Sequence, residues 1–159
     1  MRYDQRVLSD AEIERLRQSG LRLDRHGVFW HEGEAVKHEG LHRAFHRWID
    51  RLDDGRWILR LDERRYCYID VEDAPFIARS LRWEGDRAMV ALDSEREEPL
   101  DAGHIRMDEY GARASVGGGR FPVRLSTRAW QALTERALER DGKLWVVIDG
   151  VEVGIVGDA

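Results

Sequence analysis

The stretch "RAFHRWIDRLDDGRWILRLD" (residues 43–62) decides the fold, because it combines a helix pattern with a strand pattern that both recur later in the chain. One apolar face at helical spacing runs through its first part and comprises Leu41, Ala44, Phe45, Trp48, Ile49 and Leu52. The turn residues 53–55 then end the predicted helix. After them, "RWILRL" (56–61) and "YCYIDV" (66–71) predict a pair of strands.

Three blocks of this region are echoed in the same order in the second part of the chain. They pair "LRLDRHG" (21–27) with "IRMDEYG" (105–111), "RAFHRWIDRL" (43–52) with "RAWQALTERA" (128–137), and "DGRWILRLD" (54–62) with "DGKLWVVID" (141–149). Matched blocks with matched helix faces predict a repeated unit, which buries one helix stripe on a small sheet. We therefore expect an α+β protein of two structurally related halves, residues 1–75 and 76–159, each a small antiparallel sheet with a packed helix.

A separate helix is expected before the first repeat, at about residues 9–19. Ser9 and Glu12 have the spacing of a capping box, in which each residue satisfies an unpaired amide of the other. Leu8 and Ile13 have the spacing of a hydrophobic staple across the same helix start. The first half is thus expected to consist of this leading helix and the first repeat.

Composition restricts the class of protein. The chain has 159 residues, of which 42% are hydrophobic, enough for a core. No apolar run approaches the ~20 residues that span a bilayer, and the first residues lack the apolar part of a secretory signal. The net charge of -5 argues against binding long nucleic acids. With one cysteine, Cys67, no internal disulfide can form, and we expect a reducing, cytoplasmic setting.

The segment "VEDAPF" (71–76) is the most specific part of a wider resemblance. Residues 21–83 and the later "VGGGRFPVRLSTRAWQALTERA" (116–137) resemble the bacterial domain-of-unknown-function family 1285 over most of the chain. The resemblance implies two duplicated halves, the second superficially like a pleckstrin-homology fold. It also implies a cleft between the halves for a nucleotide-type ligand in signalling. No enzyme activity is established for that family.

Two acidic residues, Glu72 and Asp73, stand at the expected junction of the halves. One interpretation is a strand exit, in which Pro75 keeps Ala74 out of the helical region and Asp73 binds turn amides. The other is a binding role, because clefts form at such junctions and carboxylates accept hydrogen bonds from ligand hydroxyls or amines. The sequence leaves both open.

The basic and glycine-rich positions suggest an anion site. Gly118 lies in a run of three glycines whose amides could converge on an anion, and Arg120, directly after the run, could hold a phosphate or carboxylate. The run lacks the Gly-Lys-Ser/Thr ending of a P-loop, so a plain turn is the alternative. Lys37 stands near a position where the resembled family has an arginine, and the resemblance implies a ligand contact there.

The histidines suggest a metal site at first. His38, His42 and His46 are four residues apart, and two of them would share a helix face. Because the predicted apolar stripe lies beside them and no carboxylate or cysteine completes a known motif, we expect them on a solvated helix flank and predict no metal site. No catalytic motif is evident either, and Cys67 is expected to be buried in a strand.

These observations lead to one main hypothesis and two alternatives. The main hypothesis is a cytoplasmic, non-enzymatic protein that needs no cofactor and binds a small anionic, nucleotide-like ligand between its halves in a regulatory role. Its ligand-binding residues would be Glu72, Asp73, Lys37, Gly118 and Arg120. The alternatives are a protein-interaction module without a small ligand and, third, a hydrolase-type enzyme.

Overall fold

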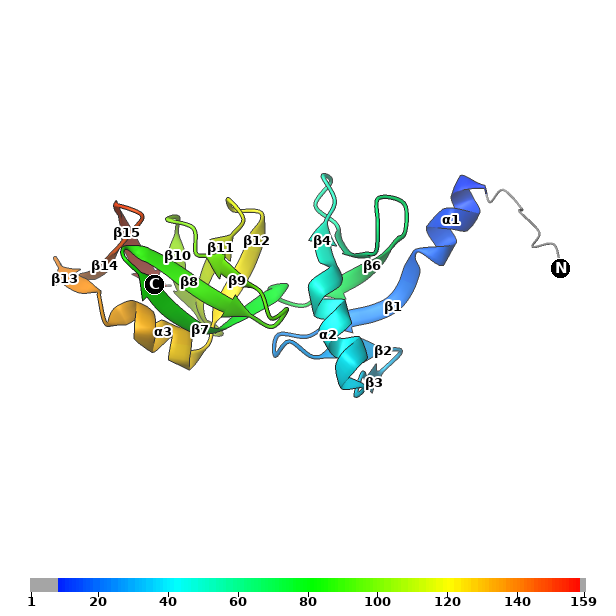
Figure 1. Cartoon of the computed structure of the whole chain (residues 1–159), viewed down its shortest axis with the longest axis horizontal. Coiled ribbons are helices and arrows are strands. Elements are labelled where there is room, and N and C mark those ends of the chain that lie inside the picture. The colour runs from blue at the N-terminus through cyan, green and yellow to red at the C-terminus, as the bar shows by residue number, and fades with distance from the viewer. Residues whose placement is uncertain (1–8, 158–159) are drawn as a thin grey trace.

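A computed structural model of the chain describes residues 9–157. In chain order, the first half comprises α1 (Asp10–Leu16), β1 (Gln18–Leu23), β2 (Phe29–His31), β3 (Glu34–Ala35), α2 (Glu39–Trp48), β4 (Ile49–Arg51), β5 (Trp57–Arg60) and β6 (Tyr66–Val71). The second comprises β7 (Phe76–Glu84), β8 (Arg87–Leu92), β9 (Glu97–Pro99), β10 (Ile105–Asp108), β11 (Gly111–Val116), β12 (Phe121–Leu125), α3 (Thr127–Thr134), β13 (Leu138–Arg140), β14 (Lys143–Ile148) and β15 (Val151–Gly157). The halves form two lobes side by side, and α1 projects from the far end of the first (Figure 1).

The strands of residues 9–157 form two mixed sheets. The first has the order β3-β2-β1-β6-β5-β4, and the second β13-β14-β15-β10-β11-β12-β7-β8-β9. The predicted α+β class is confirmed, but the prediction of antiparallel sheets is wrong, because β1 runs parallel to β6, β10 to β15, and β12 to β7. Parallel neighbours need long connections, and here those connections carry the other strands and the helix of each unit. The sheets change over at residues 72–75, where the predicted boundary lies.

The two sheets share an order of pairing. The strands β1 to β6 of the first sheet correspond in chain order to β10 to β15 of the second. With this correspondence, the first sheet's order β3-β2-β1-β6-β5-β4 becomes β12-β11-β10-β15-β14-β13, which is the order observed in the second sheet. In each unit a helix follows the third strand, and the first and last strands pair in parallel. The second sheet then adds β7, β8 and β9 at the free edge of β12. The added strands precede the second unit in sequence, as α1 precedes the first.

The leading helix α1 is shorter than the sequence predicts. Ser9 caps it, because its side-chain oxygen accepts a hydrogen bond from the amide of Glu12 at 3.2 Å. The helix ends at Leu16 rather than at residue 19, because the following residues join β1 and pair with β6. Gly20, with φ of 68°, lies at the register shift of that pairing. The predicted staple involves Leu8, which lies outside the described residues.

The second helix, α2, also ends earlier than its apolar period predicts. The period continues to Leu52, but the helix stops at Trp48, and residues 49–51 pair with β5 as strand β4. Backbone pairing with a neighbouring strand therefore overrides the local helical pattern at Ile49. The change places Ile49 in the core at 4% exposure and turns the chain toward the second half.

The expected solvated flank of histidines is wrong for His46. Its side chain is 1% exposed, and its ring packs edge-on against Phe29 at 5.0 Å. The Nε2 atom lies 2.9 Å from the carbonyl oxygen of Gly27, while Nδ1 has no hydrogen-bond partner in the described chain. The predicted stripe was centred on Leu41 and Phe45, but the helix is rotated so that Leu41 is 42% exposed and His46 points inward.

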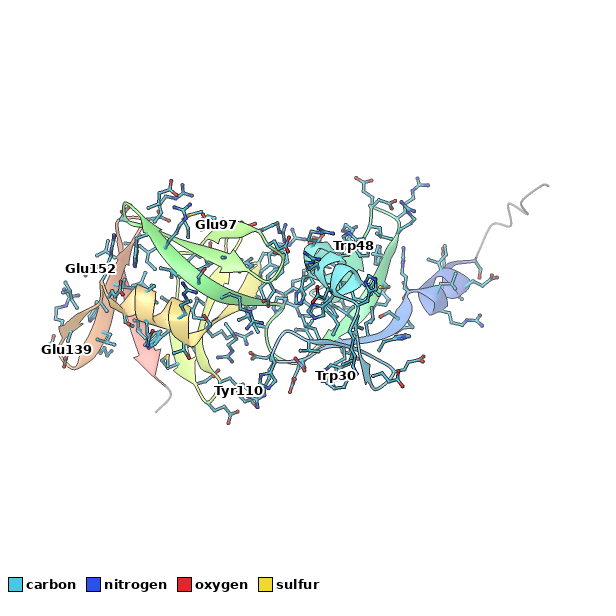
Figure 2. All side chains as sticks on the ribbon, turned by 60° about the horizontal axis from the view of Figure 1, so that its bottom comes forward. Trp30, Trp48, Glu97, Tyr110, Glu139 and Glu152 are labelled. Atoms are coloured by element: carbon cyan, nitrogen blue, oxygen red, sulfur yellow. The ribbon has the colours of Figure 1, made fainter. Side chains whose placement is uncertain are left out.

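Polar and aromatic contacts join the two halves. Arg25 lies over the ring of Tyr110 at 4.7 Å, and Tyr110 stands at the border of the lobes (Figure 2). The guanidinium of Arg79 donates to the carbonyl of His26 at 3.3 Å and pairs with Asp93. None of the described helices has the length and apolar character required to cross a membrane.

His46 predicts a pH dependence of stability. Burial lowers the pKa of its imidazole below the ordinary 6.5, against the raising effects of Asp93 and the Gly27 carbonyl. The unfolded chain therefore takes up a proton more readily, so this group favours folding above pH 6.5 and disfavours it as the pH falls below 6.5. We expect His46→Gln to cost about 1–3 kcal/mol at neutral pH and to flatten the loss of stability on acidification.

The measurement is the unfolding temperature of wild type and variant across the neutral to mildly acidic range. His104→Gln, at an exposed position, serves as the control and should keep the wild-type pH dependence. An unchanged pH dependence in the His46 variant would contradict the role of its burial.

Candidate functional site

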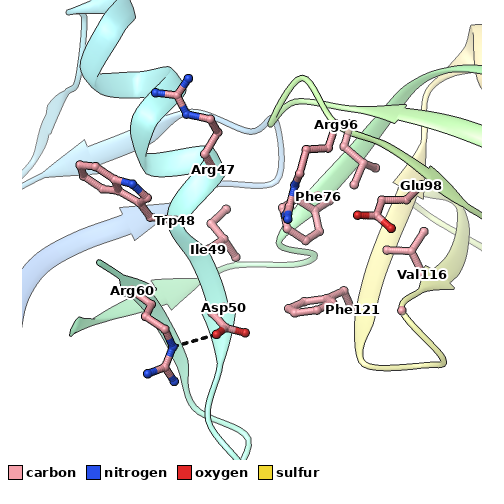
Figure 3. Close-up of a pocket in the computed structure, with 12 residues that line it drawn as sticks. Arg47, Trp48, Ile49, Asp50, Arg60, Phe76, Arg96, Glu98, Val116 and Phe121 are labelled. Carbon is pink, nitrogen blue, oxygen red and sulfur yellow. Dashed lines mark hydrogen bonds and ion pairs between the residues drawn. The ribbon is translucent and has the colours of Figure 1, made fainter. Parts of the chain in front are cut away.

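A pocket of about 420 Å³ lies between the two halves. From the first half it is lined by the end of α2, by β4 and by β5, and from the second by the start of β7 and by the segments around β9, β11 and β12. The lining residues are Arg47, Trp48, Ile49, Asp50, Arg60, Phe76, Leu92, Arg96, Glu98, Val116, Gly117 and Phe121 (Figure 3). Its size falls within the range of small-molecule sites.

Aromatic rings form part of the pocket wall on the side of the second half. Phe76 follows Pro75 at the start of β7 and is 1% exposed. Its ring meets that of Phe121 edge-on at 5.6 Å, and Trp57 continues the cluster 6.0 Å from Phe121. Figure 3 shows Phe76 and Phe121 on one side and Asp50 on the other. The partly buried ring of Phe121 can contact a planar ligand, and the buried ring of Phe76 packs against it from inside the core.

The carboxylate of Asp50 is already paired within the protein. Arg60 Nε donates to Oδ2 at 2.9 Å, and Arg120 Nη2 donates to Oδ1 at 3.2 Å. The amide of Arg51 also donates to Oδ1 at 2.8 Å. Asp50 therefore positions two arginines at the border of the pocket, and its own charge is compensated.

Two arginines of the pocket have no such partner. Across residues 9–157, no carboxylate lies within ion-pair distance of Arg47 or Arg96. Arg96 makes a long contact with the hydroxyl of Ser94 at 3.4 Å and stands over the Phe76 ring at 6.0 Å. Guanidinium groups bind phosphate and carboxylate through paired N–H donors. Glu98, which shares the pocket, can accept hydrogen bonds from hydroxyl or amine groups.

Asp73, a predicted ligand residue, is instead part of a buried ion-pair cluster. Its two oxygens accept bonds from Arg124 at 2.6 and 2.9 Å, and Arg113 donates to it at 3.0 Å. Arg124 is 6% exposed and also pairs with Asp108 at 2.8 Å. The hydrogen bonds that Arg124 donates to Asp73 are the main cause of the raised pKa of its guanidinium. Asp73 therefore joins the turn between the halves to the second sheet.

Glu72 points to the opposite side of the same turn. It is exposed, accepts a hydrogen bond from the amide of Arg25 at 2.8 Å and lies 3.9 Å from Arg22. Neither Glu72 nor Asp73 lines the pocket.

The glycine run does form an anion-binding arrangement, but the anion belongs to the protein. Gly118 and Gly119, both with positive φ, donate their amides to the carboxylate of Asp101 at 3.0 and 2.7 Å. Ser115 donates its hydroxyl to the same carboxylate at 2.8 Å. The adjacent Gly117 lines the pocket, so this internal contact shapes one edge of it.

Arg120 links the two halves. It donates to Asp50 and, at 2.6 Å, to the carbonyl of Arg51, while Arg51 donates to the carbonyl of Arg120 at 3.1 Å. Lys37 lies elsewhere, exposed in a shallow hollow that also includes His42 and Arg43. The structure thus places Arg120 and Gly118 beside the pocket and the other three predicted residues away from it.

Sequence reasoning missed Arg47 and Arg96. The chain is rich in arginine, and neither residue stands in a motif. Within residues 9–157, no cluster of three or more histidine, cysteine, aspartate or glutamate residues could hold a metal ion.

The fold and the pocket define a class: an α+β protein of two mixed sheets with a basic, aromatic hollow between its halves. Two solved structures share this fold. A DUF1285 family protein from Silicibacter pomeroyi has a TM-score of 0.69 at 16% identity, covering 86% of this chain and 79% of its own. Another from Shewanella baltica has a TM-score of 0.59 at 13% identity, covering 75% and 93%. The resemblance to this family is thereby confirmed at the level of fold. No family model and no curated protein matches the chain.

The buried cluster gives a prediction that separates structure from binding. Asp73→Asn leaves Arg124 with Asp108 as its one ionised partner among the described residues, and removing one partner of a buried pair is expected to cost about 3 kcal/mol. Glu72→Gln, at the neighbouring exposed position, should change stability by no more than about 0.5 kcal/mol. Urea unfolding of the two variants measures the difference. Equal, small effects would contradict the structural role of Asp73.

Proposed function

We propose that the protein binds a small anionic ligand with a planar group, of nucleotide type, in the pocket between its halves. The observation that carries the proposal is the pair Arg47 and Arg96, which have no carboxylate partner among the described residues although they share a pocket with aromatic rings. An unpaired guanidinium at a partly enclosed surface is well suited to a phosphate or carboxylate. The proposed role is binding without chemistry.

The remaining pocket residues would determine which ligand fits. Phe121 could contact a flat ring, and Glu98 could accept hydrogen bonds from sugar hydroxyls or base amines. The volume of about 420 Å³ is sufficient for a mononucleotide-sized molecule. Gly118 and Arg120 act in this proposal by shaping the edge of the pocket. Direct contact of Glu72, Asp73 and Lys37 with a ligand stays a prediction without support from their positions.

A regulatory role is proposed from the location of the charges. Arg47 belongs to α2 in the first half, whereas Arg96 precedes β9 in the second. An anion held by both would add a contact across a border that is otherwise formed by interactions such as Arg120 with Asp50. Ligand binding would therefore stabilise one arrangement of the halves relative to others. A cytoplasmic setting is part of the same proposal.

We also propose that the two units arose by internal duplication. The support is the common strand order and the parallel pairing of first and last strands in both. The likeness of the second half to a pleckstrin-homology fold stays a prediction.

A protein-interaction module is the second candidate. It is favoured by exposed apolar side chains on the last strands of the second sheet, where Leu138, Val147 and Val156 are 72%, 45% and 50% exposed. This surface is remote from the pocket along the sheet, so it would not compete with a ligand.

The main proposal predicts nucleotide binding that depends on both arginines. Arg47→Ala and Arg96→Ala should each weaken binding about 10- to 100-fold, because a charge-assisted hydrogen bond contributes roughly 1.5–3 kcal/mol. Isothermal titration calorimetry with adenosine and guanosine phosphates, with inorganic phosphate for comparison, measures the effect.

Arg128→Ala is the matched control, since Arg128 is an exposed helix arginine of the second half. It should leave the affinity unchanged. The proposal fails if none of these compounds binds, or if binding survives in the Arg47, Arg96 double variant.

A further inference from the structure

Helix α1 stands apart from the body of the protein. None of its residues is buried, and Leu16 is 70% exposed (Figure 1). The hydroxyl of Tyr68 donates to the carboxylate of Glu14 at 2.8 Å, which holds α1 in its projecting position. The helix therefore presents apolar side chains outward from a defined anchor instead of folding back onto its own half.

An apolar groove begins where α1 ends. It comprises two adjoining hollows of about 280 and 300 Å³ that share Leu21 and Phe45. Its lining includes Val36, Leu41, Trp48, Leu61 and Arg65. Leu41 and Leu61 are 42% and 55% exposed, so the groove is open on the surface.

The second half shows what covers the equivalent place. There β7 runs along α3: the indole N–H of Trp83 donates to the carbonyl of Ala132 at 2.9 Å, and the amide of Ser126 donates to the carbonyl of Ala78. As a result, Ala129 and Leu133 of α3 are 0% exposed.

In the first half the same flank of the helix is open. The repeat places Trp48 at the position of Leu133, and Trp48 is only partly buried and lines the groove. The element that precedes the second unit covers its helix, whereas the element that precedes the first, α1, projects away from the first lobe (Figure 1).

We propose that α1 of one copy docks into this groove of a second copy, and that the two copies exchange helices about a twofold axis. A twofold interface needs both partners of the contact on one surface patch, and α1 and the groove are contiguous through the start of β1. Each copy then donates one helix and one groove, so Leu16 and Leu41 are buried together in two equivalent contacts.

The charges of the two surfaces are complementary. Helix α1 carries three acidic residues, Asp10, Glu12 and Glu14, and one basic residue, Arg15. The only charged side chain among the groove-lining residues is Arg65, which Asp62 pairs within its own loop. The hollow next to the groove at Val36 adds Lys37 and Arg43 with one acid, Glu39. Asp62 neutralises Arg65 and Glu95 pairs with Arg43, so the cation that the acidic helix would meet is Lys37, at the Val36 end of the groove.

The first test is the mass of the full chain in solution by analytical ultracentrifugation at micromolar to hundred-micromolar concentrations. We expect twice the 18.5 kDa chain mass for wild type and the single-chain mass for Leu16→Glu and for Leu41→Glu. Leu138→Glu is the matched control, because Leu138 is 72% exposed at the other end of the molecule and should leave the dimer intact. Circular dichroism and the unfolding temperature show that each variant is folded.

The second test is complementation. A mixture of the Leu16 variant and the Leu41 variant retains one intact helix and one intact groove, so it should form a heterodimer that dissociates at a lower concentration of denaturant and at a higher chain concentration than wild type. A monomeric wild type, a dimer that survives both substitutions or is lost with Leu138→Glu, or a mixture that stays monomeric would each overturn the proposal. A mixture that stays monomeric would mean that the two leucines form one simple apolar patch. A monomeric wild type would mean that the groove takes a segment of its own chain or an apolar small molecule.

Discussion

The buried ion pair between Asp73 and Arg124 is the interaction on which the arrangement of this molecule depends. Asp73 stands in the short turn between the last strand of the first sheet and the first strand of the second, and Arg124 belongs to β12. Because both side chains are nearly inaccessible to water, leaving either of them unpaired would be costly, and the ion pair therefore ties the turn to β12. That direction brings Phe76 into the core of the second half and the end of α2 against it. The pocket lies next to this junction, since Phe76 lines it.

Arginine serves three different purposes around that junction. Arg124 neutralises buried acids, and Arg120 connects the halves through Asp50 and a carbonyl. Arg47 and Arg96 line the pocket without a carboxylate partner among the described residues. The same logic explains the glycine run, whose amides are aimed at an anion that Asp101 already supplies. Residue type alone therefore does not distinguish a ligand contact from an internal one; what distinguishes them is whether a partner of opposite charge lies within reach.

The sequence predicts the elements better than their ends. The capped start of α1, the strands around residues 56–71 and the α+β class follow from local patterns, since capping and side-chain periodicity act over a few residues. Both α1 and α2 end early, because the next residues gain more from strand pairing than from another helical turn. His46 illustrates the same limit: its inward position depends on the rotation of α2 against Phe29, which no helical spacing specifies.

The sequence by itself determined two features: the order of strands, helix and strands that occurs twice, and the resemblance in fold to the DUF1285 proteins. Both follow from patterns of residues that are close together in the sequence. Only the tertiary structure decided that the sheets are mixed, that Asp73 and Gly118 bind partners within the chain, and that Arg47 and Arg96 share a pocket. It also decided that the helix of the first unit lacks the cover that β7 provides in the second. The physical reason is common to all of these: each depends on pairs of groups far apart in sequence, and their energies are set by distance and burial rather than by neighbouring residues.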